Sequence, residues 1–360
     1  MAAYWLAARG CEVKALCGGT GGRGILDSPL APVQYQACPG GSRAFLTGVA
    51  REMLQVRFRT DTVYYLQGHE VTLPALFMLA GLPSRRIIYH TQDFLEPGRY
   101  PHWEFCERLV ARRAGCVISN EPNRARFMQS YYRLRKPPLV VPTLLPEAWP
   151  IPERDEGLRR SILARADRQD GPDLRLVMNQ GAFSRARCGQ ELIQSFHLLP
   201  PHYILILTNT DQPAYARLLG NPALQMLHRQ RRFIALGHLG FEDLLRHTAC
   251  CDLGVMLYPN EGIGGYYQAP GRLTHYMGCG LPMVASNFPG LELAFLKHSL
   301  GAVCDPASPE AIALAIRQVG EESDARCEER RVRLRVLART VFAYDRQAWQ
   351  IEEAVRQASL

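Results

Sequence analysis

The sequence predicts an α/β protein made of two doubly wound, Rossmann-like domains that face each other across a cleft. Three observations support this fold class. The chain has 360 residues, which is more than a single hydrophobic core usually holds. Apolar segments of strand length alternate with segments of helical periodicity along nearly the whole chain. The alternation stops once, at 143–173, in a stretch rich in proline and charge, and there we place the domain boundary.

The strands expected in the first half are apolar runs without polar alternation, a pattern typical of parallel strands covered on both faces. They occupy residues 12–18, 31–37, 62–68, 85–92, 115–120 and 138–143. The helices expected between them occupy residues 42–59, 71–81, 102–114 and 123–134.

The beginning of the first half departs from this alternation of strands and helices. The chain opens inside a helix-like segment, 1–13, with no strand or glycine-rich turn before it. An α/β domain normally begins with a strand. We therefore expect either that this domain has lost its first strand or that the start of the chain is placed too far downstream.

The second half repeats the alternation. Its expected strands occupy residues 174–181, 203–209, 232–238, 253–259, 282–286 and 301–305. Its expected helices occupy residues 189–199, 213–220, 241–250, 271–279 and 308–322. Ser308 is a suitable N-cap for the last of these, because proline follows it at the first helical position. Ligands of doubly wound sheets bind at the carboxyl ends of the strands, so we look for a site there.

Composition narrows the class of protein. No apolar run reaches the roughly 20 residues of a membrane-spanning helix, and no signal-peptide pattern opens the chain. The eleven cysteines form no CxxC pair and no Cys/His cluster with zinc-ligand spacing. We therefore expect a cytoplasmic protein with buried, reduced thiols and no metal site.

The net charge of +8 is unevenly distributed, because residues 1–150 carry +7 of it. An N-terminal half with this much positive charge could face anionic lipid on the inner side of a membrane, or an acidic acceptor. An ordinary solvated surface is the alternative. The arginine-rich tracts lack the interleaved aromatic residues of a nucleic-acid platform, so no nucleic-acid partner is expected.

Three stretches of the second half carry a family resemblance. They read NQGAFSRARCGQELIQSFHLLP from 179, FEDLLRHTACCDLGVMLYPNEG from 241 and APGRLTHYMGCGLPMVAS from 269. The last is similar to a family pattern that reads Pro-x-Lys-x-x-Glu-Tyr-Met-x-x-Gly-x-Pro-Val. Together they resemble the donor-binding domain of a GT-B glycosyltransferase, most similar to glycosyltransferase family 4. A weaker resemblance to the acceptor domain covers 60–145, in IIYHTQDF and GCVISNEPNRARF.

The resemblance implies an enzyme that moves a sugar from a nucleotide-sugar donor to a saccharide, lipid-linked or small-molecule acceptor. In the family the transfer retains the anomeric configuration and needs neither an obligatory metal nor a separate cofactor. A polysaccharide or glycoconjugate pathway is the implied setting. The implied domains are an acceptor domain at 1–150, a donor domain at 151–345 and a terminal helix at 346–360 that crosses back to the first domain. We expect Phe342, Tyr344 and Trp349 to anchor that helix.

Arginines at two strand-to-helix turns are candidates for binding the donor diphosphate. The leaving nucleoside diphosphate gains negative charge as the glycosidic bond breaks, so cations and backbone N–H groups are needed there. Arg185 and Arg187 follow the strand at 174–181, and Arg272 opens the helix at 271–279. Arginine forks suit phosphate oxygens, and helix N-termini favour anions. In a chain this rich in arginine, ordinary surface positions are the alternative, and more so for Arg185.

Glu261 follows the strand at 253–259 and opens a glycine-rich loop. In the resemblance it matches the first acid of a two-glutamate motif that contacts the donor sugar. Gly262, Gly264 and Gly265 would let the backbone approach a ligand closely. A solvated loop acid is the alternative.

The second acid of that motif is absent. In the frame set by the matching Pro, Tyr, Met and Gly residues, its position holds His275. The family glutamate would accept hydrogen bonds from the ribose hydroxyls. A neutral histidine accepts one such bond, so we expect weaker or differently directed nucleotide binding. A histidine packed inside an amphipathic helix is the alternative.

His90 and Asp93 lie at the end of the strand at 85–92, and His69 lies at the end of the strand before it. His90 and Asp93 could bind the acceptor or orient its hydroxyl, although a structural histidine explains the pattern as well. No residue is assigned as the base. The missing first strand and His275 also fit a non-catalytic GT-B-like partner or scaffold protein, and a sugar epimerase of the same fold is a further alternative.

Overall fold

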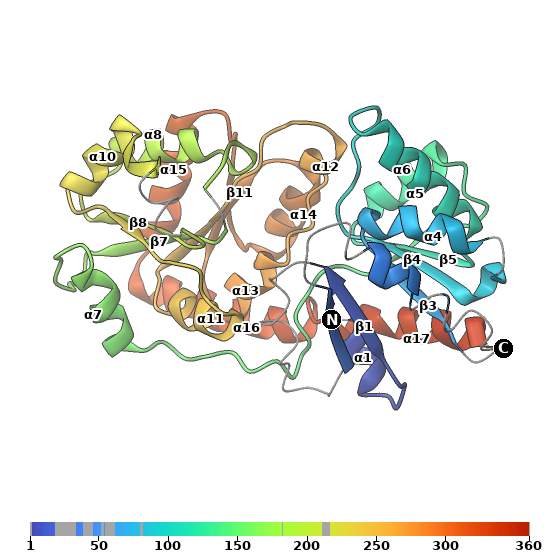
Figure 1. Cartoon of the computed structure of the whole chain (residues 1–360). Coiled ribbons are helices and arrows are strands. Elements are labelled where there is room, and N and C mark those ends of the chain that lie inside the picture. The colour runs from blue at the N-terminus through green and yellow to red at the C-terminus, as the bar shows by residue number, and fades with distance from the viewer. Residues whose placement is uncertain are drawn as a thin grey trace. The chain divides into compact units, whose positions relative to one another are not determined.

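The computed structural model describes residues 2–18, 34–38, 46–51, 54, 62–79, 82–181, 183–210 and 217–359. The chain forms two compact units (Figure 1). Unit 1 comprises 1–148, 262–269 and 344–360, and unit 2 comprises 149–261 and 270–343. The polypeptide therefore leaves unit 2 for eight residues, at 262–269, and returns to it.

Unit 1 contains parallel strands in two groups. The strands are β1 (Lys14–Gly18), β2 (Gln34–Cys38), β3 (Tyr64–Gln67), β4 (Ile87–Thr91), β5 (Cys116–Ser119) and β6 (Leu139–Val140). β1 pairs with β2, and a four-stranded sheet has the order β3-β4-β5-β6. The helices are α1 (Ala2–Ala7), α4 (Thr72–Leu79), α5 (Pro101–Arg113), α6 (Pro122–Tyr131), α12 (Ile263–Tyr266) and α17 (Asp345–Ser359).

Both faces of the four-stranded sheet are covered by helices. Successive side chains of a strand point to opposite faces. Ile87 and Tyr89 of β4 accordingly pack into a core with residues of α5 and α6. Ile88, between them, points to the other side and shares a core with Ala348 and Ile351 of α17. Burial on both faces explains why these strands read as continuous apolar runs.

The terminal helix α17 belongs to unit 1, where Tyr344, directly before it, is 3 % exposed. The expectation that Trp349 anchors this helix is wrong, because its side chain is 59 % exposed. Trp349 lies one position after Ala348 and so falls outside the buried stripe of the helix. Phe342 does not anchor it either. It lies in unit 2, where its ring meets that of His298 edge-on at 5.2 Å.

Unit 2 contains one six-stranded parallel sheet in the order β12-β11-β10-β7-β8-β9. Its strands are β7 (Arg175–Asn179), β8 (Tyr203–Leu207), β9 (Phe233–Ala235), β10 (Leu253–Met256), β11 (Met283–Ser286) and β12 (Gly301–Cys304). The chain builds outward from β7 to β9, then returns beside β7 and builds outward in the other direction. This is a doubly wound sheet. Together with unit 1 it confirms the predicted class of two α/β domains with parallel sheets.

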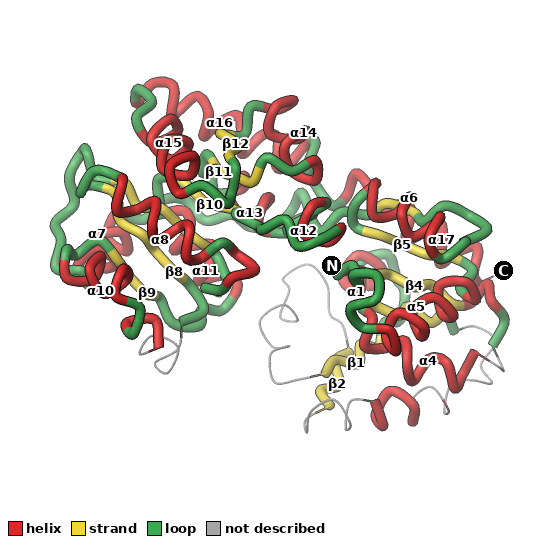
Figure 2. Tube along the Cα trace, turned by 90° about the horizontal axis from the view of Figure 1, so that it is seen from above, coloured by secondary structure: helices red, strands yellow, loops and turns green. Residues whose placement is uncertain are grey.

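Helices cover both faces of this sheet as well (Figure 2). They are α7 (Glu156–Ala164), α8 (Gly189–Leu198), α10 (Pro222–Arg229), α11 (Phe241–Ala249), α13 (Arg272–Gly278), α14 (Pro289–His298), α15 (Pro309–Gly320) and α16 (Asp324–Thr340). One core holds Val177 and Val255 of the sheet with Phe196 of α8 and Ile316 of α15. On the other face, the Tyr276 ring of α13 lies directly over β10, so α13 is fixed at the centre of the sheet.

Helix α7 was not expected, because it lies inside the proline- and charge-rich stretch, 143–173, where we placed the domain boundary. Charged residues of this stretch have partners in the fold. Asp155 caps the helix by accepting a hydrogen bond from Leu158 N at 3.0 Å. Ile162 and Leu163, on the opposite side of the helix, are buried. The expected helices at 42–59 and 213–220 lie partly outside the described residues.

Candidate functional site

The candidate site lies at the carboxyl ends of β7 and β10, the two central strands of unit 2. The strand order reverses between them, since the chain builds outward from each in opposite directions. A doubly wound sheet has its ligand crevice at such a reversal. The short helix η3 (Arg185–Arg187) follows β7, and the chain after β10 leads through Tyr258 to Glu261.

Two of the predicted arginines meet at one aromatic ring. The guanidinium of Arg187 lies 4.5 Å from the centroid of the Tyr258 ring, and that of Arg272 lies 4.8 Å from it. Arg272 Nε also donates to Tyr258 Oη at 3.0 Å. Cation–π contacts at these distances hold the two cations near each other despite their mutual repulsion. Tyr258 was not singled out from the sequence, where it reads as the end of an apolar strand.

Arg272 is held in place by the carboxyl end of β7. Its Nη1 donates to Gln180 O at 2.8 Å and to Asn179 Oδ1 at 3.4 Å, and the residue is 8 % exposed. Its Nη2 is buried and has no hydrogen-bond partner among the described residues. A buried guanidinium nitrogen without an acceptor is costly. An anion such as a phosphate group would provide that acceptor.

His275, one turn further along α13, belongs to a hydrogen-bonded chain. Its Nδ1 lies 3.0 Å from Gln180 Oε1. Gln180 Nε2 donates to Thr248 Oγ1 at 2.6 Å, and the Thr248 hydroxyl donates to Leu244 O at 2.6 Å. Because the amide nitrogen of Gln180 faces Thr248, its oxygen faces the imidazole and accepts from Nδ1–H.

This series of hydrogen bonds determines which ring nitrogen of His275 carries the proton. Burial, with the nearby charge of Arg272, lowers the pKa of His275 to about 4, so the ring is neutral at pH 7. With the proton on Nδ1, the other nitrogen, Nε2, is an acceptor. The Phe241 ring meets the imidazole edge-on at 5.1 Å and restricts its rotation. Gln180 and Thr248 were not singled out from the sequence, and nothing local distinguishes them.

Glu261 and Arg185 form an exposed ion pair. Arg185 Nε lies 3.0 Å from Glu261 Oε1, and the two side chains are 92 % and 38 % exposed, respectively. A pair this exposed contributes little stability and is easily exchanged for another partner. The carboxylate of Glu261 therefore remains accessible to a ligand.

The glycines of the loop lie in a different environment from Glu261, because Gly262–Ala269 belongs to unit 1. There the carboxylate of Glu96 accepts hydrogen bonds from Ile263 N, at 3.0 Å, and from Gly264 N. Arg124 donates to Gly264 O at 2.6 Å. A Cβ on Gly262, which has φ of 116°, would lie 2.4 Å from Glu96 Oε2. These glycines let the loop backbone approach a carboxylate of unit 1.

The predicted acceptor residues of unit 1 differ in exposure. His90, in β4, is 5 % exposed, and its Nδ1 lies 2.6 Å from Tyr65 Oη. Burial lowers the pKa of His90 to about 4. Asp93, two residues after β4, is exposed. His69 lies in the short helix η1 (His69–Val71), with its ring edge-on to Trp103 at 5.8 Å.

Two further observations concern metal ions and membranes. Across the part of the chain that the structure describes, no cluster of three or more His, Cys, Asp or Glu side chains is arranged to hold a metal ion. Within the same residues, no helix combines the length and the apolar character needed to span a membrane.

Two family models match the sequence. Residues 1–143 match a "Glycosyl transferase 4-like domain", and residues 200–322 match "Glycosyl transferases group 1". Together the two ranges span more than half of the chain. Among curated proteins, none matches this sequence significantly.

Several solved structures share the fold. Sucrose-phosphate synthase from Thermosynechococcus elongatus has 17% identity and a TM-score of 0.75, and the match covers 99% of this chain and 91% of that one. HepE from Anabaena, in complex with UDP-glucose, has 18% identity and a TM-score of 0.72 over 98% and 93% of the two chains. WaaG, a glycosyltransferase of lipopolysaccharide biosynthesis, has 16% identity and a TM-score of 0.67 over 98% and 94%. At these identities the likeness establishes the fold alone.

Proposed function

From the premise that this chain belongs to the GT-B glycosyltransferases and is related to glycosyltransferase family 4, we propose that unit 2 binds a nucleotide-sugar. The enzyme then transfers the sugar to a saccharide, lipid-linked or small-molecule acceptor. The observation that carries this proposal is the arrangement of Arg187 and Arg272 around the Tyr258 ring at the strand-order reversal. Two cations held close together at this edge of the sheet support the binding of a donor diphosphate there.

The chemistry of the leaving group explains the need for these cations. Cleavage of the glycosidic bond transfers negative charge to the nucleoside diphosphate. Arg272 is already fixed by Gln180 O and Tyr258 Oη, so it needs little rearrangement to bind a phosphate oxygen. Arg187, half-buried at the end of η3, adds a second charge. Fixed donors of this kind stabilise developing charge more effectively than mobile ones.

The other donor contacts follow from the remaining polar groups. We assign the ribose hydroxyl to His275 Nε2, which is an acceptor in the tautomer fixed by Gln180. We assign the donor sugar to Glu261, whose carboxylate pairs, among the described residues, with the exposed Arg185 alone. The sugar hydroxyls would replace that pair at little cost.

On the acceptor side, Asp93 is the better placed of the two predicted residues to touch a ligand, because it is exposed just after β4. His90 is buried and would act through the packing of β4, with Tyr65 as its partner.

Retention of configuration and independence from metal are further parts of the proposal, supported by the resemblance to family 4. The arginines would supply the positive charge that a metal supplies in other transferases. Activity that survives EDTA, and a product with the donor's anomeric configuration by proton NMR, are the expected results. Loss of activity in EDTA with recovery on adding a divalent cation would contradict metal independence.

The experiment that tests the function is binding followed by turnover. HepE is bound to UDP-glucose in a structure of the same fold, so UDP-glucose is the first donor to test. We expect calorimetry to show binding of UDP more tightly than uridine, and transfer of glucose or a related sugar to an added saccharide. Binding without hydrolysis or transfer, across a panel of donors and acceptors, would favour the non-catalytic alternative.

Contact with an anionic membrane is proposed for the basic first half of the chain, where residues 1–150 carry +7. Sedimentation with vesicles that contain phosphatidylglycerol, and release by salt, are the expected results. Equal sedimentation with neutral vesicles would contradict an electrostatic contact.

A further inference from the structure

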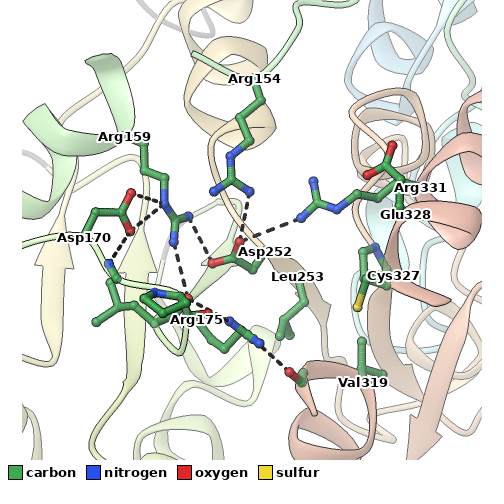
Figure 3. A pocket seen from close by; sticks show the side chains of 15 residues that line it. Arg154, Arg159, Asp170, Arg175, Asp252, Leu253, Val319, Cys327, Glu328 and Arg331 are labelled. Carbon is green, nitrogen blue, oxygen red and sulfur yellow. Dashed lines mark hydrogen bonds and ion pairs between the residues drawn. The ribbon is translucent and has the colours of Figure 1, made fainter. Parts of the chain in front are cut away.

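A cavity of about 590 Å³ lies in unit 2 at the amino ends of the strands (Figure 3). β7 begins at Arg175, β10 begins at Leu253 and β11 begins directly after Pro282, and these three residues line the cavity. In a parallel sheet the amino ends lie at the opposite edge from the carboxyl ends. The cavity is therefore separate from the candidate donor site, which holds Arg187 and Arg272.

The lining of this cavity is strongly charged. Four arginines and three acids contribute to it, and most of them appear in Figure 3 with their side chains turned toward one another: Arg154, Arg159, Arg175, Arg331, Asp170, Asp252 and Glu328. Positive charges exceed negative ones by one in the lining, and an acid just outside it, Glu156, offsets this excess by pairing with Arg154. Glu328 is exposed, so its charge is screened by water more than the others are.

A single carboxylate serves three of these arginines. Asp252 lies 3.0 Å from Arg159 Nη1, 3.2 Å from Arg154 Nη1 and 3.8 Å from Arg331 Nη2. It also accepts a hydrogen bond from Leu176 N at 2.7 Å. Arg159 has a second acid, since its Nε lies 2.9 Å from Asp170 Oδ2. Arg154 likewise has a second acid, because its Nε lies 2.7 Å from Glu156 Oε1. Among the described residues, Arg331 has only its share of Asp252, and Arg175 has no ion pair.

Two guanidinium groups remain incompletely neutralised. Arg331 is 14 % exposed, has its only ion pair at 3.8 Å, and has no hydrogen-bond acceptor for its guanidinium among the residues described. Burial lowers the pKa of Arg331, and Asp252 only partly opposes this effect. Arg175 donates to the carbonyl oxygens of Gly320, at 2.9 Å, and Pro172, at 2.6 Å, and forms no ion pair with a described acid. Carbonyl groups satisfy its hydrogen bonds but not its charge.

These observations point to an anionic ligand. A buried cation without a full counter-charge is costly, and an anion from solution would remove part of that cost. Arginine forks bind phosphate and similar oxyanions with two parallel hydrogen bonds. The volume is in the range of small-molecule sites and leaves room beyond one phosphate group, next to Leu253 and Val319.

We propose that this cavity binds a small molecule carrying a phosphate or related oxyanion group, with Arg331 and Arg175 as its main donors. The oxyanion is either free phosphate or the phosphate of an organic metabolite. The proposal does not depend on the donor site, because the two lie at opposite edges of the sheet.

The test measures anion binding in a protein whose donor site has been weakened. Arg272→Gln forms the background, so that phosphate bound at the donor site contributes little. Calorimetry at constant ionic strength then compares inorganic phosphate with glycerol 3-phosphate. Adding Arg331→Gln should weaken binding at least about tenfold, the loss expected for one charge-assisted hydrogen bond. Adding Arg339→Gln, on the exposed surface of the same helix, should leave it unchanged.

Tighter binding of glycerol 3-phosphate would identify the ligand as organic, and equal affinity would identify free phosphate as sufficient. Either supports the proposal. Equal binding with Arg331→Gln and Arg339→Gln, or no binding in the Arg272→Gln background, would overturn it. Failure of the donor site is read separately, from UDP binding to the unmodified protein.

A second readout needs no substitution, in case Arg331→Gln does not fold. Cys327 is half-buried and lines the cavity. Mass spectrometry can follow its alkylation in the unmodified protein. Glycerol 3-phosphate should slow the modification of Cys327 and leave that of the exposed Cys11 unchanged. Unchanged rates at both cysteines would contradict the proposal.

Discussion

The Nδ1 atom of His275 lies 3.0 Å from Oε1 of Gln180, a residue 95 positions away at the end of β7. Since the Gln180 amide is itself oriented by Thr248, this contact determines which imidazole nitrogen carries the proton. It also places the acceptor nitrogen, Nε2, where we propose that it meets a ribose hydroxyl.

Gln180→Glu should raise the pKa of His275 above its value of about 4. A carboxylate within hydrogen-bond distance stabilises the imidazolium, an effect of about 1 to 3 pKa units. NMR titration of the His275 ring proton measures it directly. Gln180→Leu is the matched control, because it removes the acceptor without adding charge and should leave the pKa low. An unchanged pKa in Gln180→Glu would show that the two side chains are not in contact.

Arg187→Ala and Arg272→Ala should each weaken UDP binding by about 1.5 to 3 kcal/mol, the cost of losing charge-assisted hydrogen bonds to phosphate. Binding of uridine, which has no phosphate, should change much less. Arg185→Ala is the control, because that side chain is 92 % exposed and paired with Glu261. Calorimetry with both ligands separates the effects. Equal losses for UDP and uridine would argue against a phosphate role.

Glu261→Gln should reduce the affinity for UDP-glucose and the rate of transfer while leaving the affinity for UDP nearly unchanged. The reason is that the proposed contact is to the sugar, which UDP lacks. Loss of one hydrogen bond to a charged acceptor should weaken the affinity for UDP-glucose about tenfold. Arg185→Gln breaks the same ion pair from the other side and should affect neither ligand. An equal loss of affinity for UDP would indicate that Glu261 contacts the nucleotide and not the sugar.

Unit 1 should lose stability as the pH falls from about 6.5 toward 4, because of His90. Its folded-state pKa of about 4 lies below the unfolded value near 6.5. In that window only the unfolded chain takes up the proton, so protonation favours unfolding. The neutral His90 therefore contributes about 3 kcal/mol to the free energy of unfolding at pH values above 6.5. This contribution is lost as the pH falls to the folded-state pKa.

Urea unfolding of His90→Phe at pH 7 and pH 5 checks this, with tryptophan fluorescence as the signal, since Trp5, Trp103 and Trp349 belong to unit 1 and Trp149 alone to unit 2. The variant should show a smaller difference between the two pH values than the unmodified protein. His102→Phe alters an exposed histidine of the same unit and serves as the control. An identical pH dependence in all three proteins would contradict burial of a neutral His90.

The sequence was sufficient for the architecture and for part of the site. Continuous apolar runs predicted parallel strands because burial on both faces removes the polar alternation, as the fully buried β4 and β8 illustrate. Position relative to the strand ends predicted that Arg187, Arg272 and His275 lie at one edge of the sheet. This succeeds because parallel strands present all their carboxyl ends on the same side, whatever the details of packing.

Tertiary structure decided what those side chains contact. Tyr258 contacts Arg272, 14 positions away, and Arg187, 71 positions away, and Gln180 orients His275 from 95 positions away. Such contacts depend on strand register and helix rotation, which composition and periodicity do not encode. The same reason explains two errors. Trp349 is exposed because the elements that α17 packs on determine which face of the helix is buried. Helix α7 was missed because Asp155 and Arg159 have partners that only the folded chain supplies.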